Sequence, residues 1–182
     1  MTNNKIVVSV QASLDGRVAA EGGALDWMQV KDELHAHFVD VHRTAGMFVY
    51  GRNTYDGMAG YWPTAEGAPF LVEYGKVWTA MPKLVFSRTL QSADWNTTVV
   101  HELDGLEEYR RTAEGDLYVI GSPQLITALA DRDLVDAYEI YVHPVALGHG
   151  PSILEGLSSR QGLTLTGART FDGNVVKLDY SR

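Results

Sequence analysis

Short runs of β-branched and aromatic residues alternate with helix-like segments, and this alternation constrains the fold more than any other feature of the chain. The predicted strands of this part lie at residues 6–11, 47–50, 82–87, 97–101 and 117–120. Strands that alternate with helices form mostly parallel sheets with right-handed crossovers. A long strand follows at 137–147, and a hairpin over 163–171 and 175–180 then adds antiparallel strands at one edge. We therefore predict a single domain over residues 1–182 with a mixed, three-layer α/β fold.

The clearest helical signal lies at residues 30–45. Apolar side chains recur there at steps of four, four, three and four residues: Val30, Leu34, Phe38, Val41 and Ala45. This spacing places one apolar stripe on a helix, and Gly46 is expected to end it. Two shorter helices are predicted at 55–59 and 103–112, and a loop is predicted at 61–63. Another helix is predicted to begin at Pro123, with Ser122 as its N-cap, and to run through Ala130.

Composition and charge exclude several classes of protein. The formal net charge of -8 argues against a general affinity for nucleic acid, because phosphate binding needs Lys and Arg. No apolar stretch approaches the roughly 20 residues of a membrane span, and the start of the chain does not resemble a secretory signal. The chain has no cysteine, and His35 and His37 face opposite sides of their helix, so no metal site is predicted. We expect a soluble, cytoplasmic protein that binds neither nucleic acid nor membranes.

Residues suited to binding phosphate follow three of the predicted strands. They are Gly51-Arg52-Asn53-Thr54, Ser87-Arg88 and Gly121-Ser122-Pro123-Gln124. Ligands of such sheets bind beyond the carboxyl ends of the strands, where a helix N-terminus attracts anions and guanidinium groups pair with phosphate oxygens. The glycine patterns of the Rossmann fingerprint and of the P-loop are both missing. The pattern therefore predicts a ligand with several phosphates, bound in another way.

Six segments, in order and in spacing, resemble one known group of proteins. They are residues 13–16, 51–55, 82–88, 118–122, 134–136 and 144–150. In this series the chain resembles the dihydrofolate-reductase-like superfamily. Within it, the chain is most similar to the reductase domain of the bifunctional riboflavin-pathway deaminase/reductase and its stand-alone relatives. The resemblance covers essentially the whole chain and implies the dihydrofolate-reductase-like fold.

The resemblance also implies a cofactor and the residues around it. The cofactor would be NADPH, held by Ala12, Val18, Gly51, Arg52, Thr54, Ser87, Arg88, Gly121, Ser122 and Leu125. Ser87 and Arg88 match the pair beside the adenosine 2′-phosphate. The reaction would be hydride transfer to a C=N bond of a small pyrimidine or pteridine-like heterocycle. The resemblance further implies a homodimer.

The residue that protonates the substrate is left open between two acids. Relatives that reduce folate carry a carboxyl group a few residues after a Trp, and here Trp27 is followed by Asp32 and Glu33. Spacing favours Asp32, whereas helix geometry favours Glu33, on the flank of the apolar stripe with His37 one turn later. Alternatively, both acids only complement the helix dipole.

The substrate is also left open. We expect Trp27, His37 and Trp62 to contact it, although Trp62 is equally suited to covering the core under a loop. The Asp-Asn-Pro segment of the riboflavin-pathway domain is missing, and Gly60-Tyr61-Trp62-Pro63 occupies that neighbourhood. A dihydrofolate reductase and a catalytically silent NADP(H)-binding module are therefore the alternatives to a riboflavin-type reductase.

Overall fold

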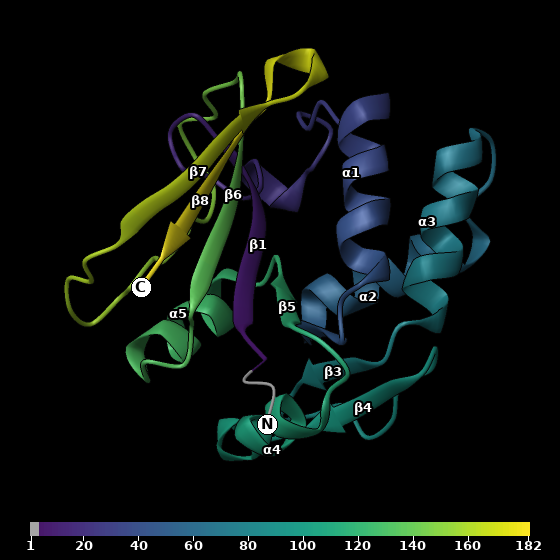
Figure 1. The fold of residues 1–182 in the computed structure, drawn as a ribbon, viewed down its shortest axis with the longest axis vertical. Coiled ribbons are helices and arrows are strands. Elements are labelled where there is room, and N and C mark those ends of the chain that lie inside the picture. The colour runs from purple at the N-terminus through teal and green to yellow at the C-terminus, as the bar shows by residue number, and fades with distance from the viewer. Residues whose placement is uncertain (1–3) are drawn as a thin grey trace.

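The computed structural model describes residues 4–182, and its mixed α/β sheet confirms the predicted fold class (Figure 1). Eight strands form the sheet in the order β4-β3-β2-β5-β1-β6-β8-β7. The strands are β1 Ile6–Ser13, β2 Met47–Gly51, β3 Lys83–Phe86, β4 Thr97–Val100, β5 Leu117–Ile120, β6 Ala137–His143, β7 Thr164–Thr170 and β8 Val176–Ser181. The first six run parallel to one another, and β8 runs antiparallel between β6 and β7. The hairpin therefore adds antiparallel strands at one edge, as predicted.

Helices cover both faces of the sheet. They are α1 Asp32–Arg43, α2 Arg52–Tyr61, α3 Pro69–Ala80, α4 Leu106–Thr112 and α5 Pro123–Asp131. Side chains of α1 and α3 share one buried cluster, and those of α4 and α5 share another. Strand β2 contributes side chains to both clusters, because successive side chains of a strand point to opposite faces. Phe48 lies in the cluster with α1, and Val49 lies in the cluster with α5. None of the helices within residues 4–182 is long and apolar enough to cross a lipid bilayer.

Several predicted boundaries were wrong. Helix α3 was not predicted at all; its β-branched and aromatic residues have low intrinsic helix propensity, and tertiary packing of Tyr74 and Trp78 stabilises it instead. Helix α2 begins three residues before the predicted start, and a 3-10 turn replaces the loop at 61–63. The strand predicted to reach Leu147 ends at His143, because Pro144 has no N–H to continue the ladder.

Gly46 has a different role from the predicted one. Helix α1 already ends at Arg43, and the Thr44 hydroxyl donates to the Val41 carbonyl there. The Gly46 N–H donates to the Asp116 carbonyl at 2.9 Å, at the start of β2. A Cβ atom on Gly46 would lie 2.3 Å from the carbonyl oxygen of Gly115. Glycine is therefore required by close backbone contact rather than as a helix cap.

Candidate functional site

A cleft of about 780 Å³ lies at the carboxyl ends of β2, β3, β4 and β5. It is lined by Gly51, Arg52, Asn53, Thr54, Phe86, Ser87, Arg88, Thr89, His101, Leu103, Ser122, Pro123, Gln124, Leu125, Pro151 and Glu155. The structure thus brings together most of the residues expected to bind cofactor: Gly51, Arg52, Thr54, Ser87, Arg88, Ser122 and Leu125. These segments are far apart in sequence, and they meet because parallel neighbouring strands end at one edge of the sheet.

The floor of the cleft is formed where β2 and β5 end. The Ser122 hydroxyl accepts a hydrogen bond from the Gly51 N–H at 2.8 Å and donates to the Thr54 hydroxyl at 2.8 Å. Gly121 has a φ of 60°, and a Cβ atom there would lie 2.9 Å from the Thr54 methyl group. Glycine at 121 therefore lets the two strand ends approach, and these contacts hold the backbone of the floor in place.

Ser122 is the N-cap residue of α5 and Pro123 its first helical residue, as predicted, but the Ser122 hydroxyl makes no capping hydrogen bond. Ser122 adopts a left-handed conformation, with φ 59° and ψ 62°, and its side chain points to Gly51 and Thr54 rather than to the helix. The first backbone N–H of α5 with an intrahelical acceptor is that of Ile126, which donates to the Ser122 carbonyl at 3.0 Å. The N–H groups of Gln124 and Leu125 are therefore without intrahelical acceptors, at the wall of the cleft.

Two guanidinium groups lie at the exposed part of the cleft. Arg52 donates to the Thr89 hydroxyl at 2.8 Å and pairs with Asp56 at 3.3 Å. Arg88 is exposed and makes no hydrogen bond or ion pair with another residue in the described part of the chain, 4–182. The Ser87 hydroxyl accepts the Leu90 N–H at 3.1 Å and shapes the turn that carries Arg88. A negatively charged ligand group here would meet the Arg52 guanidinium, which is already held in place, and the Arg88 guanidinium, which has no partner within residues 4–182.

Ala12 and Val18 lie beside this cleft rather than in its lining. Ala12 is buried in β1, where it pairs with Val142 of β6. Val18 is also buried, and its N–H donates to the carbonyl of Pro151, a lining residue, at 2.9 Å. Val18 is therefore next to the Pro151 end of the cleft.

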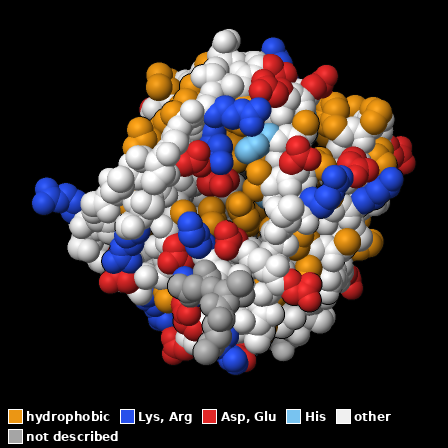
Figure 2. All heavy atoms as spheres, viewed as in Figure 1, with side chains coloured by type: hydrophobic (Ala, Val, Ile, Leu, Met, Phe, Trp, Pro, Cys, Tyr) orange, Lys and Arg blue, Asp and Glu red, His pale blue; other side chains and the backbone are white. Residues whose placement is uncertain are grey.

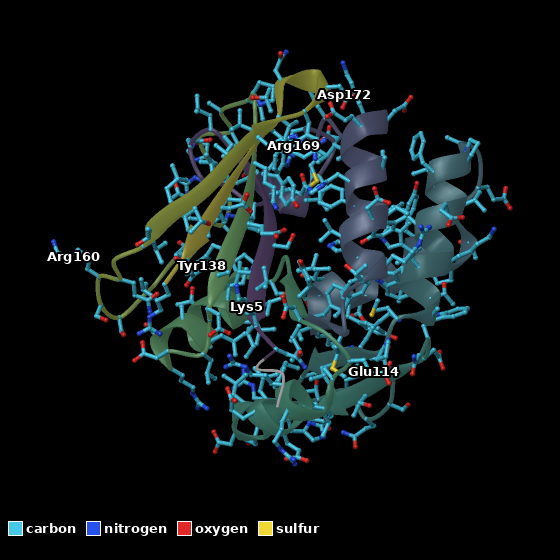
Figure 3. The ribbon with its side chains drawn as sticks, in the orientation of Figure 1. Lys5, Glu114, Tyr138, Arg160, Arg169 and Asp172 are labelled. Atoms are coloured by element: carbon cyan, nitrogen blue, oxygen red, sulfur yellow. The ribbon has the colours of Figure 1, made fainter. Side chains whose placement is uncertain are left out.

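The two candidate acids lie outside the cleft lining. Glu33 accepts hydrogen bonds from the Arg169 guanidinium and from the Asp172 N–H, both at 2.9 Å. Arg169 and Asp172 lie together at the N-terminal end of α1 (Figure 3). The hydrogen bond from Arg169 is the main cause that lowers the pKa of Glu33 below its usual value. Glu33 thus ties α1 to the β7–β8 turn as a carboxylate, whereas Asp32 is exposed and unpaired within residues 4–182.

His37 takes part in a polar network between α1 and the sheet. Its Nε2 lies 3.0 Å from the Tyr141 hydroxyl, which donates to Glu139 at 3.1 Å, so Nε2 is assigned as the donor. Burial lowers the pKa of His37 to about 4. Lys177 pairs with Glu139 at 3.2 Å and with Asp179 at 2.8 Å. Figure 2 shows such acidic and basic groups side by side around an apolar recess, so this face offers mutually paired charges.

Trp62 is half-buried and packs against the core beside α3. Its Nε1–H donates to the Met58 sulfur at 3.0 Å, and its ring centroid lies 4.4 Å from that of Tyr74. Of the two roles open to Trp62 from the sequence, these contacts favour covering the core. Its neighbour Tyr61 is the exposed aromatic residue of this segment.

Trp27 is held in place by His143, which sequence reasoning missed. The Gln29 N–H donates to His143 Nδ1 at 3.0 Å, so Nε2 carries the proton and donates to the Gln11 side chain at 2.5 Å. The ring of Trp27 meets His143 edge-on, with centroids 5.4 Å apart. His143 therefore anchors the loop before α1 to the carboxyl ends of β1 and β6. A histidine inside the strand predicted at 137–147 was the available signal.

Buried neutral histidines make stability depend on pH. Burial lowers the pKa of His143 to about 4 and that of His42 to about 3, and His42 Nε2 has no hydrogen-bond partner among residues 4–182. Below pH 6.5 the unfolded chain binds protons that the folded chain excludes. We therefore expect the free energy of unfolding to change little between pH 7 and 8 and to fall between pH 6.5 and 4, by about 2–4 kcal/mol between pH 7 and 5.

Urea denaturation at pH 7 and pH 5 checks this expectation. The variant His42→Gln should lose about a third of the pH-dependent difference, because His37 and His143, whose pKa is also lowered by burial, remain. The variant His149→Gln is the control, since His149 is exposed and should leave the difference unchanged. An equal difference in all three proteins would contradict the assignment to buried histidines.

Comparisons with known proteins agree with this architecture. Dihydrofolate reductase from Enterococcus faecalis, solved with NADP(H) and RAB-propyl, matches with a TM-score of 0.65 at 13% identity, over 99% of this chain and 97% of that one. The strand order and this likeness thus define the dihydrofolate-reductase-like fold. More particularly, the chain belongs to the RibD C-terminal domain family, whose model matches residues 4–177.

Further relatives share nearly the whole chain. The uncharacterized protein YyaP of Bacillus subtilis (strain 168) is 28% identical over 186 residues, covering 99% of this chain and 98% of YyaP. A protein from Shewanella sp. PV-4 assigned to riboflavin biosynthesis matches with a TM-score of 0.76 at 20% identity, over 98% of both chains. A deaminase/5-amino-6-(5-phosphoribosylamino)uracil reductase from Thermotoga maritima matches with a TM-score of 0.66 at 14% identity, over 98% of this chain and 56% of that one.

Proposed function

We propose that this protein is an NADPH-dependent reductase. The observation that carries the proposal is the single cleft in which two guanidinium groups, a helix N-terminus and a hydroxyl-lined floor meet at four neighbouring strand ends. A dinucleotide with three phosphate groups needs anion-binding groups at two places, and the cleft offers both. The family and the NADP(H)-bound reductase of the same fold support this choice of cofactor.

Each part of the cleft has a distinct task in this proposal. Arg88, with Ser87 beside it, binds the 2′-phosphate, and the N–H groups of Gln124 and Leu125 receive the pyrophosphate. The nicotinamide end is directed towards Pro151, whose carbonyl accepts the Val18 N–H. Bound NADPH would supply the hydride, and the chain would orient it and exclude water.

The proposed acceptor is a C=N bond in a small pyrimidine or pteridine-like heterocycle. The activity that names the Thermotoga maritima protein, reduction of a phosphoribosylaminouracil, supports a substrate of this kind. For protonation of the substrate nitrogen, Asp32 is preferred to Glu33, because Glu33 is held as a carboxylate by Arg169 and the Asp172 N–H. A catalytically silent NADP(H)-binding module is the second candidate, favoured by the position of both acids outside the cleft lining.

Calorimetry and absorbance assays test the proposal in two steps. Titration with NADPH and with NADH should give heat for both and tighter binding of NADPH. Oxidation of NADPH is then followed with the phosphoribosylaminouracil and with dihydrofolate as substrates. Turnover of the uracil supports the riboflavin-type reductase, turnover of dihydrofolate supports the folate alternative, and binding without turnover supports the silent module. Lack of heat with either nucleotide would overturn the proposal.

A further inference from the structure

His101 occupies a defined position at the exposed part of the cleft. It follows β4 directly, and the pairing of Val100 with Phe86 places it opposite Ser87. Its Nδ1 lies 2.6 Å from the Ser87 carbonyl oxygen. A carbonyl oxygen can only accept, so Nδ1 carries a proton and donates it. In the neutral ring the second nitrogen, Nε2, is therefore an acceptor, and protonation converts it into a charged donor.

The groups around His101 favour an anion. Arg52 and Arg88 line the same cleft, from the ends of β2 and β3. Two nearby carboxylates are committed to other arginines, Asp56 to Arg52 and Asp104 to Arg132. Glu102, next to His101, is exposed and unpaired within residues 4–182, and Glu155, also in the lining, accepts the Ser152 N–H. The ends of the neighbouring strands β2, β3 and β4 thus each present a side chain that can carry a positive charge: Arg52, Arg88 and His101.

We infer that His101 is a third residue that recognises the 2′-phosphate, beside Arg52 and Arg88. In its protonated form it adds a positive charge to the site and so increases the preference for NADPH over NADH at low pH. The inference rests on the proposed function, because it requires that the 2′-phosphate lies at this part of the cleft. Imidazole is the side chain that ordinarily gains its charge between pH 5 and 8, so His101 differs from the two permanently charged arginines. The hydrogen bond to Ser87 fixes the ring, so that the new N–H is already oriented when it forms.

The experiment compares His101→Gln with the wild type. Glutamine keeps a hydrogen-bonding side chain but cannot be charged. We expect the substitution to weaken NADPH binding about tenfold at pH 6 and about twofold at pH 8, and to leave NADH binding within about twofold at both. The 2′-phosphate itself loses charge as the pH falls through about 6, and comparing the variant with the wild type at each pH cancels this shared effect. His35→Gln, on α1 against Phe70, is the control and should behave as the wild type.

An independent readout is the NMR titration of the His101 ring. Addition of NADPH should raise the pKa of His101, whereas NADH should leave it nearly unchanged. If the wild type binds neither nucleotide, the proposed function fails. If the wild type prefers NADPH and the ratio of affinities between His101→Gln and the wild type is the same at pH 6 and pH 8, the role of His101 alone is overturned. An unchanged pKa of His101 on NADPH binding would overturn it as well.

Discussion

Replacement of Arg88 by alanine is expected to remove most of the preference for NADPH. Affinity for NADPH should fall about 10- to 100-fold, the equivalent of one lost charge-assisted phosphate contact, roughly 1.5–3 kcal/mol. Affinity for NADH should stay within about threefold, because NADH lacks the group that Arg88 would bind. Arg88 is uncommitted within residues 4–182, so its removal leaves no buried partner unsatisfied and should not disturb folding. Calorimetric titration with both nucleotides measures the two affinities.

Arg43→Ala is the matched control for the loss of positive charge. Arg43 lies at the C-terminal end of α1, at the opposite end of the sheet, where it pairs with Glu73 at 2.6 Å. Its substitution should leave both affinities unchanged. Arg52→Ala should act in the same direction as Arg88→Ala, with the added loss of the contact to Thr89. An equal loss of NADPH and NADH binding in Arg88→Ala would show that this arginine does not recognise the 2′-phosphate.

Replacement of Gly46 by alanine is expected to cause a large loss of stability. The new Cβ would lie 2.3 Å from the Gly115 carbonyl oxygen and 2.5 Å from its nitrogen. Both are backbone atoms next to β5, so the strain cannot be relieved by rotation of a side chain. Overpacking against backbone should cost about 3 kcal/mol or more of the free energy of unfolding. Urea denaturation followed by circular dichroism measures this cost.

Gly57→Ala is the control for the addition of a methyl group to glycine. Gly57 lies inside α2, and a Cβ atom there meets no other group within 4 Å. Alanine is a better helix former, so this variant should be more stable by about 0.5–1 kcal/mol. If Gly46→Ala unfolds at the same urea concentration as the wild type, the close approach of β2 and β5 at this point is not as described.

The site was predictable where one rule about sheets applied. The carboxyl ends of parallel strands share an edge, so Gly51–Thr54, Ser87-Arg88 and Ser122 were expected together, and they line one cleft. The same rule, applied to the strand ending near residue 100, would have added His101. The expected roles of individual side chains were less reliable. Ser122 is the N-cap residue of α5, as expected, but its hydroxyl bonds to Gly51 and Thr54 instead of capping the helix, because its left-handed backbone turns it away from the helix.

Other features depend on partners that are distant in sequence. Helix α3 has weak helix formers and is stabilised by burial of Tyr74 and Trp78. Glu33 meets Arg169 because the β7–β8 turn folds over the start of α1, at a separation of 136 residues. His143 meets Gln11 and Gln29 in the same way, across strand β1 and the loop before α1. None of these contacts has a local signature, because each requires the sheet to be assembled first.

The sequence by itself determined the class of fold, the parallel core with its terminal hairpin, and the group of residues at the strand ends. It did so because side-chain periodicity and strand–helix alternation are local properties of the chain. Only the tertiary structure decided which carboxylate is paired, which aromatic ring is packed into the core, and which glycine is required by a neighbouring backbone. Those outcomes depend on distances between residues that the chain brings together only when it is folded, and on the cost of burying charge or overlapping atoms at these contacts.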